Sequence, residues 1–171
     1  VDITHNIAAY NLLQTAYIVR NAYKFFPEGS IHIVAVDSFY HKNRKNILAK
    51  IDGHYFICAD NGITNLMFFD IKPEAIYEIT LNNRFDDKVI FPATEIFVPA
   101  AMHLYKGGLP EVIGRKIKSI KDVSFPRAIY NENEKMIVGE VMYVDNFGNV
   151  VSNISRKFFD KYASVSEKYT V

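Results

Sequence analysis

The chain has 171 residues, 49% of them hydrophobic and 23% charged, which suffices for one sizeable core and a small second unit. A formal net charge of +1 gives no field that favours nucleic acid or an anionic membrane surface as a partner. No apolar run approaches the roughly 20 residues of a membrane-spanning helix, and the one cysteine, Cys58, excludes a disulfide framework. We therefore expect a cytoplasmic protein with neither nucleic acid nor membrane among its partners.

The first 36 residues predict a helix between two extended segments. Residues 1–4 are expected to be the end of a strand. Residues 9–26 carry apolar side chains at helical spacing and predict an amphipathic helix that Pro27 and Gly29 end. Residues 30–36 form an almost continuous apolar run, which is typical of a buried parallel strand.

A polar loop follows this strand. Asp37 stands directly after the strand, and Arg44 follows seven residues later, with His41 between them. Ligands of open α/β sheets bind beyond the carboxyl ends of the strands, so a carboxylate and a guanidinium in this loop are well placed to act on a bound ligand. From the residues alone, a solvated loop with an incidental ion pair is the alternative.

The next elements are a hairpin and a second loop. Residues 47–51 and 54–58 flank the pair Asp52-Gly53, which predicts a two-residue turn of type I′. Residues 59–62, Ala-Asp-Asn-Gly, then form another loop after a strand.

A strand and a helix follow in the middle of the chain. Residues 76–81 predict the strand, and residues 94–105 predict a helix that Thr94 caps and Gly107 ends. His103 lies in that helix among apolar neighbours and is expected to be a hydrogen-bonded structural residue.

Residues 121–135 lose periodicity and gain polarity, which indicates a linker. We therefore expect an α/β domain at residues 1–120 and the start of a second, β-rich domain at residues 136–171. The sequence contains no cysteine–histidine spacing typical of a metal site and no phosphate-binding glycine loop, so we expect no metal.

The second domain opens with a predicted hairpin. Residues 138–144 and 150–154 are rich in β-branched side chains, and Gly148 stands where the turn needs a left-handed residue. The turn also presents a carboxylate, a phenyl ring and two amides, which are the groups that a purine pocket uses. An ordinary β-hairpin without a ligand is the alternative.

Five blocks of sequence together resemble the S-adenosylmethionine (SAM) hydroxide adenosyltransferases, relatives of the SAM-dependent fluorinases and chlorinases. The blocks, in order, are VDITHNI (1–7), IHIVAVD (31–37) with Arg44 beyond it, ADNGI (59–63), F-x-x-x-E-I-F-V-P-A-A-x-H-L (91–104) and GEVMYVDNFGNVVSNI (139–154). Each block alone is a weak signal, but five in order across nearly the whole chain are specific. The resemblance implies a Rossmann-like, mostly parallel sheet followed by the start of a barrel-like C-terminal domain. It also implies a further strand before Val1 and further residues after Val171.

The activity that the resemblance implies is hydrolysis of SAM to adenosine and methionine by attack of water or hydroxide on C5′, without a cofactor. By resemblance Asp37 would accept the proton and Arg44 would steady both the carboxylate and the hydroxide. Asp145 would face the methionine ammonium group, Phe147 the face of the adenine, and Asn149 its edge.

Four more positions acquire a substrate-binding role from the resemblance. Tyr10 would form the second wall of the purine site, and Phe91 would close the ribose side. Asp60 and Asn61 would line the same cleft. The resemblance also implies a homotrimer whose site forms between the first domain of one subunit and the second domain of its neighbour.

The sequence departs from the family pattern at Pro92, where many family hydrolases have a histidine. Three explanations stay open: His41 takes over that role, the pair of Asp37 and Arg44 suffices, or the chain is a SAM- or adenosine-binding module without catalysis. A SAM-dependent halogenase is less favoured, because the halogenases have a tyrosine at the position of Asp37 and a carboxylate beside a halide is electrostatically unfavourable.

Overall fold

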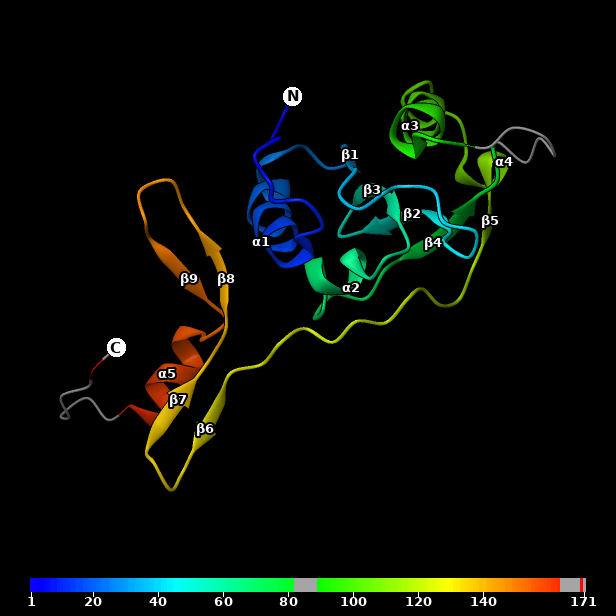
Figure 1. Ribbon diagram of the computed structural model, residues 1–171. Coiled ribbons are helices and arrows are strands. Elements are labelled where there is room, and N and C mark those ends of the chain that lie inside the picture. The colour runs from blue at the N-terminus through cyan, green and yellow to red at the C-terminus, as the bar shows by residue number, and fades with distance from the viewer. Residues whose placement is uncertain (82–88, 164–169, 171) are drawn as a thin grey trace. The chain divides into compact units, whose positions relative to one another are not determined.

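The computed structural model describes residues 1–81, 89–163 and 170, and the chain divides into two units (Figure 1). Unit 1 comprises Val1–Ser124 and unit 2 comprises Phe125–Val171. The boundary between the units falls within the linker predicted at residues 121–135. Residues 164–169 and 171 of the predicted second domain lie outside the described residues.

Unit 1 is built on a five-stranded sheet in the order β1-β3-β2-β4-β5. The strands are β1 (Ile31–Val34), β2 (Asn46–Ile51), β3 (His54–Ala59), β4 (Ala75–Ile79) and β5 (Gly114–Lys116). Among the described residues only β1 and β3 pair parallel, whereas β2 pairs antiparallel with β3 and β4, and β4 with β5. The mostly parallel sheet that we expected is therefore a mixed sheet, and its Rossmann-like character is limited to one pairing.

The sheet is mixed because a tight turn folds β3 directly back on β2. Asp52 and Gly53 both have positive φ, 51° and 74°, as a type I′ turn requires. The hairpin predicted from this Asp-Gly pair is thus confirmed. Two strands joined by two residues pair only antiparallel, because a parallel pair needs a crossover of a dozen or more residues.

The first helix lies against this sheet as α1 (Leu12–Ala22) and continues into a 3-10 turn, Tyr23–Phe25. It starts later than the predicted residue 9 because Asn11 caps it: the Asn11 side chain accepts a hydrogen bond from the Gln14 amide at 3.0 Å. The helix predicted at residues 9–26 is otherwise confirmed.

The helix predicted at residues 94–105 is also present, but its first turn is π-helical. The turn, Ala93–Phe97, leads into α3 (Val98–Tyr105); the other helices of unit 1 are α2 (Ile63–Met67) and α4 (Pro110–Ile113). The cap predicted at Thr94 is wrong, because Thr94 lies inside the π-helical turn and its hydroxyl donates to the Phe91 carbonyl at 3.2 Å. Glu95 instead accepts hydrogen bonds from the amides of Ile90 and Phe91, at 3.1 and 2.7 Å.

Helices cover both faces of the sheet, with α1 and α3 on opposite sides (Figure 1). The core facing α3 and α4 consists of Leu48, Ile57, Ala59, Tyr77, Ile79, Ile96, Phe97, Ala100 and Ile113. On the α1 face, the ring of Tyr23 meets Phe56 and Phe68 edge-on, at centroid distances of 5.7 and 5.4 Å. Cys58 is a buried free thiol, and burial raises its pKa to about 12, so it remains a protonated core residue.

Residues 1–4, expected to be the end of a strand, pair with no strand in the described part of the chain. Their polar groups instead make local contacts. His5 Nδ1 lies 2.8 Å from the Asp2 carboxylate, and the Asn6 amide donates to the Thr4 hydroxyl at 3.0 Å. A strand in a sheet is defined by its ladder hydrogen bonds, and this segment forms none within the described residues.

Unit 2 contains two antiparallel pairs of strands and one helix. The pairs are β6 (Ile129–Asn131) with β7 (Met136–Val138) and β8 (Val141–Val144) with β9 (Val150–Ser152); the helix is α5 (Arg156–Tyr162). The β8–β9 hairpin confirms the predicted one, and Gly148 has the left-handed φ of 84° expected there. Among the described residues the small sheets do not close into a barrel.

Candidate functional site

The predicted carboxylate–guanidinium pair forms in the loop that follows β1. Arg44 Nη1 donates to the backbone carbonyl of Asp37 at 2.7 Å and to its carboxylate Oδ1 at 3.1 Å. Both side chains are largely shielded, with 22% of Arg44 and 19% of Asp37 exposed. The guanidinium thereby fixes the loop backbone and the carboxylate together, which an incidental surface ion pair would not do.

Asp37 adopts a backbone conformation that is uncommon for a residue with a side chain. Its φ is 48°, in the left-handed region, and Tyr10 has a φ of 63°. Non-glycine residues in this region are strained and persist where surrounding contacts hold them, often at functional sites. Two of the candidate site residues therefore share a conformation that the local sequence does not favour.

Asn61, expected to line the substrate cleft, is instead packed beneath the Asp37 loop with only 3% of its surface exposed. Its side-chain amide nitrogen donates to the carbonyls of Val36 and Asp37, each at 3.1 Å. Its side-chain oxygen accepts from the Ile63 amide at 3.1 Å. The sequence identified the residue, but only the fold shows which groups it binds.

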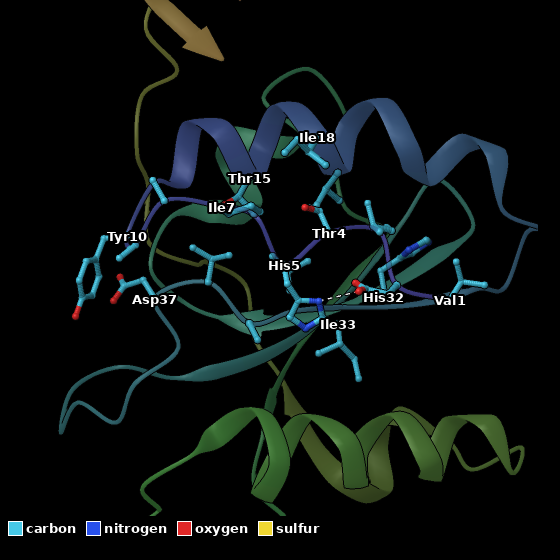
Figure 2. A pocket seen from close by; sticks show the side chains of 18 of the residues that line it. Val1, Thr4, His5, Ile7, Tyr10, Thr15, Ile18, His32, Ile33 and Asp37 are labelled. Carbon is cyan, nitrogen blue, oxygen red and sulfur yellow. Dashed lines mark hydrogen bonds and ion pairs between the residues drawn. The ribbon is translucent and has the colours of Figure 1, made fainter. Parts of the chain in front are cut away.

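A cavity of about 940 Å³ lies between residues 1–10, α1 and β1. Asp37 and Tyr10 lie beside each other at one end of it, and Thr15 and His32 line it farther along (Figure 2). Ligand sites are typically concave, mainly apolar and about 300–1,000 Å³ in volume, with a few polar groups that fix orientation. The cavity matches that description, and the residues that line it include Asp37, the partner of Arg44.

An aromatic pair stands at the same end of the cavity. The rings of Tyr10 and Phe39 lie with centroids 6.4 Å apart and planes tilted by 45°, and the two residues are 63% and 58% exposed. Exposed rings of this kind offer flat apolar surface to a planar ligand. Sequence reasoning missed Phe39, although an apolar aromatic residue two positions after a candidate catalytic aspartate was a usable signal.

Asp60 connects the site to a later segment of unit 1. Its carboxylate accepts a hydrogen bond from the Lys121 amide at 2.7 Å, and its own amide donates to the Lys45 carbonyl at 2.8 Å. The residue therefore ties the end of the Asp37–Arg44 loop to the chain that follows β5.

The predicted candidates His41 and Phe91 are not joined to Asp37 by any hydrogen bond or ring contact in the residues that the structure describes. His41 is exposed, and its Nδ1 accepts from the Asn43 amide at 3.3 Å within its own loop. Phe91 is 60% exposed at the start of the π-helical turn, next to Pro92.

Two other histidines have structural partners. His103 Nε2 lies 3.0 Å from the Leu109 carbonyl, as expected for a hydrogen-bonded structural residue. His54, expected to be a strand-end residue, is buried at the start of β3 with its Nδ1 3.2 Å from His32 Nε2. Burial, with a smaller effect of His54, lowers the pKa of His32 to about 4. Sequence reasoning missed this histidine pair, because its members lie on different strands.

In unit 2, the three predicted residues of the β8–β9 turn bind one another. Asp145 Oδ1 accepts from the amides of Phe147 and Asn149, both at 2.8 Å, and Oδ2 accepts from the Asn149 side chain at 2.7 Å. The hydrogen bond from the Asn149 side chain, with those from the turn amides, holds the pKa of Asp145 below its usual value. The Phe147 ring is left 91% exposed.

No group of three or more His, Cys, Asp or Glu side chains that could hold a metal ion occurs within the described ranges. In the same part of the chain, no helix has the length and apolar character needed to cross a bilayer.

The fold and the site together define an α/β domain with a charged pair beyond the carboxyl end of a strand, beside a cavity of ligand size. Comparison with protein families makes this more specific. The SAM hydroxide adenosyltransferase N-terminal domain matches residues 1–114, and the C-terminal domain of the same family matches residues 139–171. The chain belongs to the SAM hydroxide adenosyltransferase family.

Individual relatives agree with this assignment. The chain is 26% identical over 165 residues to the (R)-S-adenosyl-L-methionine hydrolase of Thermus thermophilus, a match that covers 91% of this chain and 63% of the relative. It is 24% identical over 168 residues to the protein of the same name from Methanocaldococcus jannaschii, covering 94% and 57%. A crystal structure of an uncharacterized conserved protein from Thermotoga maritima is similar with a TM-score of 0.82 and 28% identity, covering 95% and 62%. The chain thus spans about three fifths of the length of the relatives that it matches.

Proposed function

We propose that this protein hydrolyses SAM to adenosine and methionine. The observation that carries the proposal is the Asp37–Arg44 pair, half-buried after β1 at the end of a 940 Å³ cavity. Family membership and the name of two relatives, (R)-S-adenosyl-L-methionine hydrolase, support the choice of substrate. The (R) in that name specifies the configuration at sulfur, so both sulfonium epimers need to be tested as substrates.

In the proposed reaction water attacks C5′ of the ribose in line with the carbon–sulfur bond. The new C5′–O bond forms as the C5′–S bond breaks, and the bonding electron pair leaves with sulfur, so that methionine departs as a neutral thioether. The proton lost by the water passes to the Asp37 carboxylate, which acts as general base. Arg44 holds that carboxylate in place and stabilises the negative charge that develops on the attacking oxygen.

Substrate binding is proposed to use both units. Tyr10, at the end of the cavity, would contact one face of the adenine, and the exposed ring of Phe147 the other. Phe91 would close the ribose side. In a homotrimer, the Phe147 turn of one subunit would meet the Asp37 loop of its neighbour.

The turn in unit 2 has hydrogen-bonding capacity left for this role. A carboxylate offers about four acceptor positions, and three hydrogen bonds within the turn occupy Asp145. The methionine ammonium group would donate a hydrogen bond to the acceptor position of Asp145 that remains. Asn149 donates one of its two side-chain N–H groups to Asp145, so its carbonyl and second N–H would be available to the adenine edge.

We propose that Asp37 and Arg44 suffice to activate water without a histidine. His41 is exposed and its Nδ1 accepts a hydrogen bond within the loop, whereas Asp37 and Arg44 are shielded and directly paired. No metal or cofactor enters the proposed reaction, because the sulfonium already makes methionine a good leaving group.

A SAM- or adenosine-binding module without catalysis is the second candidate, and Pro92 is the observation that favours it. Proline has no side-chain group that can accept or donate a proton, so a chain that relied on the family histidine would be inactive. Incubating the full-length protein separately with the R and S sulfonium epimers, followed by chromatography of the products, separates the candidates. Equal amounts of adenosine and methionine support hydrolysis. Binding in calorimetry without either product supports the module, and a halogenated adenosine formed in added halide would support the halogenase instead.

A further inference from the structure

Asn61 and the Asp37 loop are joined by an arrangement of hydrogen bonds that uses every polar group of the asparagine side chain. The amide nitrogen has two N–H groups, and these meet the carbonyls of Val36 and Asp37. The side-chain oxygen accepts from the Ile63 amide at the start of α2. The orientation of the amide is unambiguous, because the reversed orientation would set a donor against the Ile63 N–H and an acceptor against two carbonyls.

We propose that Asn61 is a positioning residue for the reaction: it holds the Asp37 backbone in its left-handed conformation and so directs the carboxylate to the cavity. This inference rests on the proposed function, in which Asp37 accepts the proton from water. Asn61 is 97% shielded, and it is not among the residues that line the cavity, whereas Asp37 is. It therefore acts through Asp37 and does not touch the substrate.

The strained conformation of Asp37 explains why such a residue is needed. A φ of 48° is uncommon for a residue with a side chain, and contacts that hold the backbone there stabilise it. The Asp37 carbonyl accepts from two donors, Asn61 Nδ2 at 3.1 Å and Arg44 Nη1 at 2.7 Å. Asn61 and Arg44 thus hold the same peptide group from two directions, and Arg44 continues to the carboxylate.

The neighbouring residue fixes the other end of the loop. The Asp60 amide donates to the Lys45 carbonyl at 2.8 Å, directly after Arg44. Gly62 makes the tight turn that follows possible: its φ is 100°, and a side chain there would overlap Val123. The segment from Asp60 to Gly62 consequently binds both ends of the Asp37–Arg44 loop.

Two substitutions separate this role from a merely structural one. Asn61→Asp keeps the shape of the side chain and the acceptor for the Ile63 amide but loses both N–H donors at neutral pH. Asn61→Ala removes all three hydrogen bonds. Asn65→Ala is the matched control, because it deletes an asparagine amide of α2 that donates to the Asp122 carboxylate at 2.8 Å and has no hydrogen bond with Asp37.

The experiment measures kcat and KM for adenosine release from SAM, thermal unfolding, and the crystal structures of wild type and Asn61→Asp. A catalytic group displaced by about 1 Å can lose on the order of 10²-fold in rate. We expect kcat of both Asn61 variants to fall by about 10²-fold with KM changed less than about threefold, and Asn65→Ala to keep wild-type kcat. In the variant crystal structure Asp37 should leave the left-handed region.

Wild-type kcat in folded Asn61→Asp would overturn the proposal. A lower unfolding temperature with unchanged kcat per folded site would also overturn it, since the role would then be structural only. If Asn61→Ala does not fold, the kcat of Asn61→Asp alone tests the proposal. If wild type releases no adenosine, the proposed function fails. The structures then decide the positioning role: an unchanged Asp37 φ in Asn61→Asp overturns it, and a changed φ supports it.

Discussion

One guanidinium nitrogen of Arg44 holds Asp37 twice, at 2.7 Å from the backbone carbonyl and 3.1 Å from the carboxylate. A guanidinium nitrogen carries two N–H groups, so both hydrogen bonds form at once. The consequence is that the direction of the carboxylate and the fold of its loop are fixed together. A substitution that removes the carboxylate but keeps the size of the Asp37 side chain is therefore the most informative single test of the proposed reaction.

Replacing Asp37 by Asn should abolish turnover and preserve binding. The change keeps the side-chain volume but removes the base, and loss of a general base costs roughly 10²–10⁴-fold in rate. Adenosine release, measured by chromatography, should fall by that factor while calorimetry still detects SAM. Asp70→Asn is the control, because Asp70 also forms a carboxylate–guanidinium pair, with Arg20 at 2.7 Å. Equal adenosine release by wild type and Asp37→Asn would rule out the enzymatic proposal.

Replacing His41 by Ala should leave turnover near normal. The imidazole is exposed and its observed hydrogen bond is to the Asn43 amide at 3.3 Å, within its own loop. We expect kcat within about threefold of wild type, because activity of the Asp37–Arg44 pair requires no third group; a general base would be worth roughly 10²-fold or more. A loss as large as that of Asp37→Asn would instead assign His41 the role of the family histidine.

Replacing Phe147 by Ala should weaken adenosine binding without affecting stability. Stacking of a base on an aromatic ring contributes roughly 1–3 kcal/mol by alanine substitution, which corresponds to about five- to 150-fold in Kd. The fold should be unaffected, because 91% of the residue is exposed on its turn. Calorimetry with adenosine measures the effect, and Phe25→Ala, at an 88% exposed phenylalanine of unit 1, is the matched control. Unchanged affinity in Phe147→Ala would remove this ring from the site.

Mixing two impaired variants should restore activity if the site forms between subunits. The expectation follows from the family resemblance and from the exposed position of Phe147 in unit 2. Asp37→Asn lacks the base, and the double variant Phe147→Ala/Asn149→Ala lacks the proposed adenine contacts. In a mixed homotrimer some sites would combine an intact Asp37 loop with an intact Phe147 turn. Light scattering should give three times the chain mass, and activity that stays at the sum of the two separate samples would contradict the shared site.

Acidification should destabilise unit 1 through the buried histidine pair. The pKa of His32 is lowered from 6.5 to about 4 by burial and by His54. In the pH window between these values the unfolded chain binds more protons than the folded one, so stability increases with pH there and is lost as the pH falls from 6.5 towards 4. One pKa unit corresponds to 1.36 kcal/mol, so the full change is about 3 kcal/mol.

Urea unfolding at pH 7 and pH 5 tests this prediction. His32→Phe keeps a ring stacked on Phe56, where the two rings now lie 4.8 Å apart, but removes the titrating group. The loss of stability between pH 7 and pH 5 should be smaller in the variant than in wild type. An identical loss in both proteins would mean that other groups cause the acid sensitivity.

The features that could be predicted from the amino-acid sequence are local ones. The turn at Asp52-Gly53 and the left-handed Gly148 follow from the φ values that short turns require, and these depend on adjacent residues alone. The Asp37–Arg44 pair spans one loop, so its members were within reach of each other whatever the rest of the chain did.

Contacts between segments that are distant in the sequence could not be predicted and depend on the packing of the whole fold. Asn61 meets Asp37 across 24 residues and His32 meets His54 across 22, because β1 and β3 lie side by side in the sheet. Apolar runs and their periodicity predict that a strand exists, but they do not identify the strand that pairs with it or the direction of that pairing. For the same reason the sequence predicted a mostly parallel sheet, whereas β2 pairs antiparallel with both of its neighbours. Which strands pair is set by the packing of the whole core, and it is this pairing that brings Asn61 under the Asp37 loop.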